Sequence, residues 1–393
     1  MIAQYEPMDR VRKNFKVSWY RCPIEREDLQ RLTKRSYVRG FFQALGHLAL
    51  VAATGYLVFR FFFLQQWALF AASLFVHGTF LTFFPMSSVH ELAHKTVFKK
   101  PWLNKVFLWI YSIPGWFNFY WYNVSHTYHH LYTLHPRGDR EVLLPKTPSL
   151  NFLYLLQLFT VNIFGGFESV GMIPTIGGTI RLAVTGKFSS SIGVGGSWLE
   201  DIFTPDLAEE RKKAVNFARF LLLFHAAVIT VSIVFKLWPL MMIVTFGTFV
   251  GNGLRYFIGV PMHTGLRTNV DDFRKCVRTI RLNPFFSFLY WRMNWHTEHH
   301  MYAAVPCYHL RELHYTVQDD MPKPRTLIGA WRELRETWKK QQEDPSYEYD
   351  TPVPEEKTHT GASGKTADEE KQTVQKQDPE ESSLGNLRPD SMN

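Results

Sequence analysis

Cysteine is scarce in this chain of 393 residues, which contains Cys22, Cys276 and Cys307 only. Their spacings fit neither a framework of disulfides nor a CxxC metal site. We also expect no cleavable signal peptide, because the opening stretch MIAQYEPMDRVRKNFK is charged and has no apolar core. We therefore expect the first membrane-spanning segment to act as the targeting signal.

Acidic residues are outnumbered, with 35 Asp and Glu against 44 Lys and Arg, so the formal net charge is +9. No motif for nucleic-acid recognition accompanies the excess of positive charge. The basic surface is expected to face anionic lipid head groups. An acidic electron donor or a phosphorylated substrate carrier are the other partners that it would suit.

Aromatic residues, by contrast, are abundant, at 16% of the chain with 33 Phe and 12 Trp. Two apolar stretches, residues 41–84 and 214–260, are each long enough for two helices of about 20 residues, the length that crosses a bilayer. The sequence therefore predicts an all-α integral membrane protein with two transmembrane hairpins. The four spanning helices are expected at about 41–64, 67–85, 214–235 and 239–260.

Basic residues flank both predicted hairpins, in residues 1–40, 95–105 and 261–340. Positive charge marks cytosolic segments, so these are expected on the cytosolic side, where they form a helical cap. The apolar stretches 101–121 and 152–180 contain Pro, Gly and polar residues, which favours interfacial helices over full spans. The protein is therefore expected to be multi-pass.

Three regions follow from composition: a basic cytosolic N-terminal segment (1–40), a membrane domain (41–342) and an acidic tail (343–393). The tail contains 13 acidic and five basic residues and few apolar ones. This composition predicts disorder.

Histidines at helical spacing are the main chemical signal. HTYHH and HTEHH each place three imidazoles at i, i+3 and i+4, and HELAH places two at i and i+4. Isolated histidines inside apolar runs, by contrast, are expected to be core residues bonded to their neighbours. These are His47, His77 and His225.

Eight imidazoles exceed the three or four ligands that one zinc ion takes, so two metals are the simplest interpretation. Imidazole also suits copper, iron and nickel, and ligand type alone leaves the metal open. Chemistry on an unactivated hydrocarbon at a membrane face favours a redox metal. The predicted ligands are His90, His94, His126, His129, His130, His296, His299 and His300.

A zinc protease is the competing interpretation, because HELAH matches HExxH, in which Glu91 would be the general base. Such a site needs only one further ligand, whereas six more histidines stand in HxxHH format. Glu91 is therefore expected to support a metal-bound imidazole instead.

HELAHK, HTYHH and HTEHH, in this order and with a helical hairpin before the first and the third, resemble the three histidine boxes of the membrane-bound fatty acid desaturase superfamily. The resemblance covers roughly residues 40 to 320 and is closest to bacterial-type desaturases. It implies a non-haem di-iron centre that binds two iron ions through the eight histidines. It also implies His263, in PMHTGLRTNVDDF, as a ninth ligand.

The resemblance further implies O2-dependent desaturation of a fatty acyl chain or related lipid, with electrons from a separate cytochrome b5 or ferredoxin and its reductase. It would place the protein in the endoplasmic reticulum of a eukaryote or the inner membrane of a bacterium. A hydroxylase or acetylenase stays open, although the second box of alkane hydroxylases reads HxxGHH and HTYHH does not. A scaffold without catalysis is a further alternative. Asp139, Asn294 and Glu298 are candidates to support ligands, and His135 and His309 are left as supporting or structural.

Overall fold

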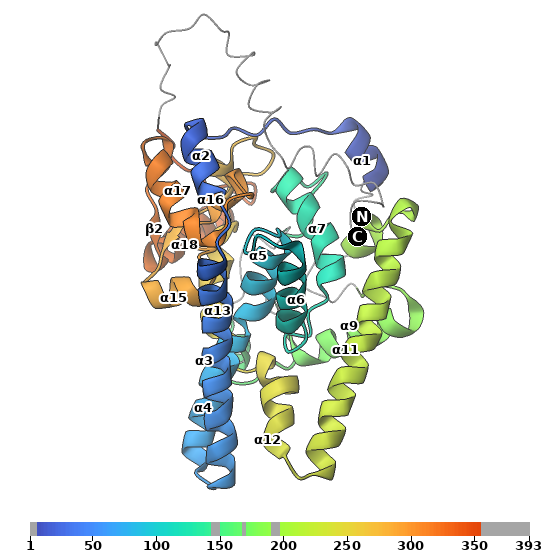
Figure 1. Cartoon of the computed structure of the whole chain (residues 1–393). Helices are drawn as coiled ribbons and strands as arrows, with labels where there is room; N and C mark the ends of the chain where they lie inside the picture. Colours follow the sequence, from blue (N-terminus) through green and yellow to red (C-terminus); the bar gives the residue numbers. More distant parts are fainter. Residues whose placement is uncertain (1–5, 143–149, 167–169, 190–196, 355–393) are drawn as a thin grey trace, which may run out of the picture. The chain divides into compact units, whose positions relative to one another are not determined.

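The computed structural model describes residues 6–142, 150–166, 170–189 and 197–354, and these residues fold mainly into helices (Figure 1). Among them a single small sheet pairs β1 (Ile280–Arg281) with β2 (Arg325–Thr326) in parallel. The contacts divide the chain after Val353, so the described residues belong almost wholly to the first unit. The prediction of a helical fold is confirmed in the main, with this small sheet as the exception.

The first predicted hairpin consists of α3 (Tyr37–Phe63) and α4 (Trp67–Leu81), joined by a turn in which Gln65 has a φ of 55°. The second helix continues through a π-helical turn, η1 (Phe84–Val89), into α5 (His90–Ala93). Tyr37–Phe63 and Trp67–Ala93 are both long and apolar enough to cross a membrane. The two spans predicted in residues 41–85 are therefore present as helices.

The second hairpin differs from its prediction in the returning arm. η2 (Pro205–Leu207) and α11 (Ala208–Val234) form one apolar helix of 30 residues, which begins before the predicted 214–235. The return through α12 (Trp238–Met241), η3 (Met242–Phe246) and η4 (Gly247–Phe249) is shorter.

A break ends the returning arm, so the predicted span 239–260 is not one continuous helix. Val250 is extended and Gly251 has a φ of 69°, and the helix resumes only as α13 (Gly253–Gly259). A Cβ on Gly251 would lie 2.5 Å from Thr79 Oγ1, so only glycine fits this close approach to α4. The described residues thus contain three helices that meet the length and composition of a membrane span, not the four predicted.

The segments predicted to be interfacial contain short helices: α6 (Pro101–Ser112), α8 (Phe152–Leu158) and α9 (Met172–Thr185). Within the described residues none of them is a candidate span. On α6, Trp102, Val106 and Ile110 lie exposed at i, i+4 and i+8. This stripe on a short helix suits a helix that lies along a membrane surface.

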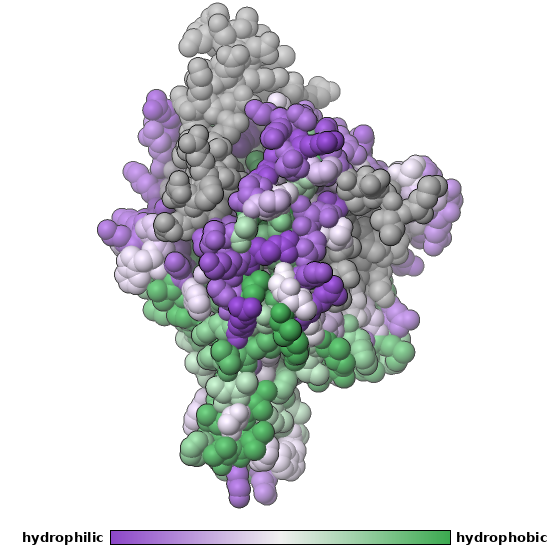
Figure 2. Space-filling model, turned by 90° about the vertical axis from the view of Figure 1, so that its right-hand side faces the viewer, coloured by the Kyte–Doolittle hydropathy of each residue, from purple (hydrophilic) through white to green (hydrophobic). Residues whose placement is uncertain are grey.

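The remaining helices gather around α5 and α7, at the end opposite the two hairpin turns (Figure 1). Figure 2 shows hydrophobic side chains over the hairpin half of one face and hydrophilic ones over the other half. This division is that of a membrane part and a water-facing cap. The cap helices are α1 (Met8–Asn14), α2 (Arg26–Leu32), α7 (Phe119–Tyr132), α10 (Trp198–Ile202), η5 (Val260–Met262), α14 (Phe273–Cys276), α15 (Pro284–Leu289), α16 (His296–Met301), η6 (Cys307–His309), α17 (Leu310–Val317), η7 (Gln318–Asp320) and α18 (Leu327–Glu343).

The predicted disordered tail begins too early. Residues 344–353 pack back on the loop after His263, where the Tyr349 N–H donates to the Gly265 carbonyl at 2.8 Å. Glu348 accepts from the Thr268 N–H at 2.9 Å, and Thr351 is only 2% exposed. The acidic residues of this segment pair with hydrogen-bond donors and basic side chains. The low apolar content of the segment does not predict these contacts. Residues 355–393 lie outside the described residues.

The isolated histidines are buried and bonded through both ring nitrogens, as predicted. His47 bonds the Phe80 carbonyl and the Trp291 indole N–H, and His77 bonds the Thr54 hydroxyl and the Ile243 carbonyl. His225 bonds the Thr245 hydroxyl and the Ile113 carbonyl. All three cysteines are buried and free, which confirms that they form no disulfide.

Candidate metal centre

Two helices carry the HxxHH boxes into the interior of the cap. α7 is preceded by the N-cap residue Asn118, whose side chain accepts from the Tyr120 N–H at 3.2 Å and so stabilises the start of the helix. Its box spans residues 126–130, and α16 carries the equivalent box at 296–300. The first box begins α5 directly after the π-helical turn η1, and His94 is the C-cap residue of α5.

The nine histidines predicted as ligands converge in two groups. In each group, one ring nitrogen from every member lies within 4.8 Å of the others. The five-histidine group contains His90, His94, His126, His130 and His299, and the four-histidine group contains His129, His263, His296 and His300. The structure thus brings together the three boxes and the additional histidine after the last apolar segment.

Ring nitrogens face one another inside both groups. Nε2 atoms lie 2.7 Å apart in His90 and His299, and 3.0 Å apart in His263 and His296. His94 Nε2 and His300 Nε2 are buried with no hydrogen-bond partner. Buried polar atoms normally have a partner, so these inward nitrogens fit a cation as their missing partner.

Two outer ring nitrogens of the five-histidine group contact oxygen atoms of neighbouring side chains. His126 Nδ1 lies 3.0 Å from Glu141 Oε1, and the Tyr122 hydroxyl lies 2.9 Å from His90 Nδ1. Such contacts orient an imidazole and leave the opposite nitrogen free for a metal.

The four-histidine group is supported in the same way. His129 Nδ1 lies 2.9 Å from Asp139 Oδ2, and His300 Nδ1 lies 3.1 Å from the Thr133 hydroxyl. His263 Nδ1 donates to the Cys276 carbonyl at 3.2 Å. Each Nδ1 contact again leaves Nε2 for the interior of the group.

Burial favours the neutral imidazole, which is the form that binds metal. It lowers the pKa of His94 to about 4 and that of His296 to about 3. His129 is the exception, because the Asp139 carboxylate outweighs burial and raises its pKa. Burial also raises the pKa of Glu141 to about 7.

A buried arginine fixes the loop that carries His263. Arg278 is 0% exposed, and its guanidinium donates to the carbonyls of Pro261 and Thr264 at 2.7 and 2.5 Å. The same guanidinium donates to Glu333 on α18 at 2.6 Å. The backbone on both sides of His263 is therefore tied to the C-terminal helix.

The proposed supporting residues divide between site and scaffold. Asp139 contacts His129, and Glu91 Oε1 lies 3.4 Å from His299 Nδ1. Glu298 instead bonds Thr279 and His314, and Asn294 bonds Ser287 and the Ile280 carbonyl. These last two residues hold the protein scaffold and not the nine histidines.

The other two histidines near the boxes also lie outside both groups. His135 contacts the Thr133 carbonyl, and His309 contacts Arg39 and Glu312.

Sequence reasoning missed Glu141, Tyr122 and Thr133 as partners of the histidines. The position of Glu141, two residues after Asp139, could have indicated its role. The Asp139 Oδ1 accepts from the Glu141 N–H at 2.9 Å and turns the chain inward. The position of Tyr122, one helical turn before His126, could likewise have indicated a contact with the histidines. The two rings stack with their centroids 4.8 Å apart.

The comparisons with known proteins agree with this site. The search of curated proteins found no match. The sequence model named "Fatty acid desaturase" matches residues 65–331, which is more than half of the chain and includes all three boxes and His263. The chain therefore belongs to the fatty acid desaturase family.

Proposed function

We propose that the protein is an O2-dependent, non-haem di-iron oxidoreductase that desaturates a fatty acyl chain or a related lipid. The convergence of nine histidines in two groups, seven of them buried, carries the proposal, together with the family. Desaturation converts CH2–CH2 to CH=CH, and O2 takes up the two hydrogen atoms, two electrons and two protons to give two molecules of water.

The residues present fit two metal ions. His90, His94, His126, His130 and His299 would hold one ion, and His129, His263, His296 and His300 would hold the other. A redox-active metal pair supplies the oxygen activation that an unactivated C–H bond requires.

The chain itself supplies position and a dry environment. Glu141 and Asp139 hold His126 and His129 by their outer nitrogens, so the inner nitrogens keep their direction. Seven of the nine histidines are buried, which favours the neutral imidazole except at His129 and limits the access of bulk water to the groups.

The surroundings support a lipid substrate. Three apolar helices suit a membrane protein, and the family acts on acyl chains. We propose the cytosolic side for the histidines, in the endoplasmic reticulum or a bacterial inner membrane. The electrons would come from a separate cytochrome b5 or ferredoxin with its reductase.

A hydroxylase or acetylenase is the second candidate. The same site would yield an alcohol when one oxygen atom is transferred to carbon, and a triple bond when two hydrogen atoms are removed from an existing double bond. The HExxH zinc protease is disfavoured by geometry. Glu91, the base of that mechanism, lies against His299, and the five-histidine group offers more ligands than the protease needs.

Metal content and lipid profile test the proposal together. The purified full chain in detergent is expected to contain iron at about two ions per chain, as two ligand groups require. Cells that express it should accumulate unsaturated products, whereas hydroxylated ones would select the second candidate. A single zinc with no new lipid product would refute the oxygen-activating function.

A further inference from the structure

A basic hollow lies at the cap end of the first membrane-spanning helix. It has a volume of about 380 Å³ and is formed by the turn between α2 and α3 and the loop between α5 and α6. Three of the four residues that form it are basic, and the four are Thr33, Lys34, Arg35 and Lys99. We call it the Lys99 hollow.

The Lys99 hollow lies where the polar cap meets the apolar helices. The candidate span α3 begins at Tyr37, two residues after Arg35. Val38 on α3 and Trp102 on α6 each follow a basic residue of the hollow by three positions, and they are 79% and 60% exposed. Apolar side chains that are exposed in this way beside a membrane span suit contact with lipid. A ligand in the hollow therefore has apolar surface next to it.

The two walls of the hollow are held together by hydrogen bonds. The Tyr308 hydroxyl accepts from the Ser36 N–H at 2.6 Å and donates to the Val97 carbonyl at 3.3 Å. Asn104 fixes the second wall, because its side chain accepts from the Phe98 N–H at 3.1 Å and donates to the Phe98 carbonyl at 3.0 Å. The basic side chains therefore project from a backbone that binding does not have to order.

The positive charge of the hollow is not balanced by neighbouring carboxylates. Among the residues that the structure describes, its three basic side chains form no salt bridge, and Lys99 Nζ lies 5.7 Å from the centre of the Tyr37 ring. The acidic residues Asp28 on α2 and Glu312 on α17 both bond Arg31 instead. Gathered positive charges repel one another, and an anion with several oxygen acceptors relieves this repulsion.

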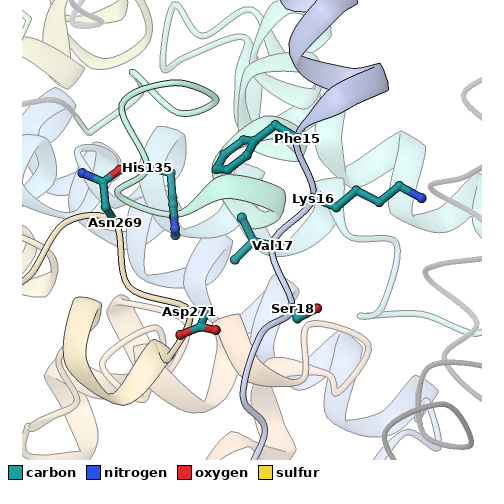
Figure 3. A pocket seen from close by; sticks show the side chains of 7 residues that line it. All are labelled: Phe15, Lys16, Val17, Ser18, His135, Asn269 and Asp271. Atoms are coloured by element: carbon teal, nitrogen blue, oxygen red, sulfur yellow. The ribbon is translucent and has the colours of Figure 1, made fainter. Parts of the chain in front are cut away.

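A larger hollow elsewhere on the cap differs in charge. It has a volume of about 460 Å³, and Lys16 and Asp271 are among the residues that form it (Figure 3). Lys16 points away from the other side chains, and Asp271 brings a negative charge (Figure 3). This hollow therefore does not gather positive charge, and the basic residues around Lys16 provide a control for those of the Lys99 hollow.

We propose that the Lys99 hollow binds the head group of an anionic phospholipid, whose acyl chains lie along the exposed apolar side chains of α3 and α6. The lipid phosphate accepts hydrogen bonds from the Arg35 guanidinium and the Thr33 hydroxyl, and the two lysines add positive charge. This binding goes beyond the proposed reaction, since it requires neither a metal nor an oxidisable acyl chain. The loop that carries Lys99 connects His94 with α6, so the bound lipid stabilises the segment after the first box.

Retention of lipid by the purified full chain tests the site. Native mass spectrometry counts the lipids that the chain retains from micelles with equal amounts of phosphatidylglycerol and phosphatidylcholine, and wild type should prefer phosphatidylglycerol. A basic side chain near anionic lipid contributes about fivefold in affinity, so Lys99→Gln should weaken phosphatidylglycerol binding by about that factor. Lys34→Gln/Arg35→Gln/Lys99→Gln should weaken it by about 100-fold. Wild-type retention in this triple variant would overturn the site.

Arg10→Gln/Lys13→Gln/Lys16→Gln is the matched control, because it also removes one exposed arginine and two exposed lysines from the cap. It should retain phosphatidylglycerol as wild type does. An equal loss in both triple variants would mean that net charge, and not the Lys99 hollow, attracts the lipid. Thermal unfolding in phosphatidylcholine alone checks that each variant is folded. If the triple variant of the hollow unfolds early, Lys99→Gln decides, and wild-type retention there overturns the site.

Soluble phosphates distinguish a lipid from other phosphate ligands of the hollow. Glycerol 3-phosphate carries a phosphate ester without acyl chains, and coenzyme A represents a phosphorylated acyl carrier. Neither should displace phosphatidylglycerol from wild type, even in excess, because the acyl chains contribute apolar contacts that both compounds lack. Displacement by either compound would assign the hollow to a soluble phosphate and would overturn the lipid site.

Discussion

The two histidine groups have different origins, although they lie side by side. All five members of the five-histidine group come from the three boxes, on or next to α5, α7 and α16. The four-histidine group draws three members from α7 and α16, but His263 follows the short turn η5 and is held through Arg278 to α18. The first group is thus completed by the boxes, and the second depends on the C-terminal part of the fold.

The boxes divide their histidines between the groups in a regular way. In α7 the i, i+4 pair His126 and His130 joins the five-histidine group and His129 joins the other. In α16 the pair His296 and His300 joins the four-histidine group and His299 joins the other. Residues at i and i+4 share a helix face, so each HxxHH box contributes two histidines to one group and one to the other.

Loss of a ligand should give the largest difference between the groups. His263→Ala leaves three histidines in its group, whereas His94→Ala leaves four in the other. We expect His263→Ala to lose its metal with an affinity loss above about 100-fold, more than the loss of a supporting residue costs. His94→Ala should retain more metal, and iron per chain by plasma mass spectrometry measures both. Equal retention would show that ligand number does not distinguish the groups.

Arg278→Met should give the next largest difference in metal content between the two groups. Removing one partner of a buried ion pair costs about 3–5 kcal/mol of stability. Because the guanidinium also holds the carbonyls on both sides of His263, the four-histidine group should lose its metal while the five-histidine group keeps one. Iron content and thermal unfolding in detergent report the two effects.

Lys339→Met provides the control on α18. Its ion pair with Glu336 is exposed, so the expected cost is below about 1 kcal/mol and the iron content should not change. Loss of both metals in Arg278→Met would instead indicate general unfolding and would contradict the selective coupling.

The sequence predicted which histidines come together better than the means by which they are held. Helical spacing and the resemblance selected the nine histidines, but spacing did not reveal that the i+3 histidine of each HxxHH box joins the other group. The buried clamp around Arg278 could not be predicted, because its partners Pro261, Thr264 and Glu333 are joined only by the tertiary fold. Hydropathy likewise predicted a continuous fourth span over residues 239–260. Hydropathy contains no information on the close approach of Gly251 to Thr79, which breaks the helix there.

Replacement of the carboxylate beside each group by an amide should have a smaller effect on metal binding, and the effect should be similar in the two groups. Asp139→Asn weakens the support of His129, and Glu141→Gln weakens that of His126. Each should lower the metal affinity of its own group by about 10- to 100-fold and leave the other group intact. Titration with a chelator, followed by the iron that remains, distinguishes the two. If either variant releases both metals in parallel, the groups do not act independently.

Tyrosine hydroxyls on α7 give the smallest expected effect and the closest control. The Tyr122 hydroxyl contacts His90 in the five-histidine group, whereas the equally buried Tyr128 hydroxyl has no hydrogen-bond partner. Tyr122→Phe should therefore cost about 0.5–1.5 kcal/mol in metal binding, which is about tenfold at most, and Tyr128→Phe should cost nothing. The chelator titration should show the loss in the five-histidine group alone. An equal loss in both variants would mean that ring packing, and not the hydroxyl, positions His90.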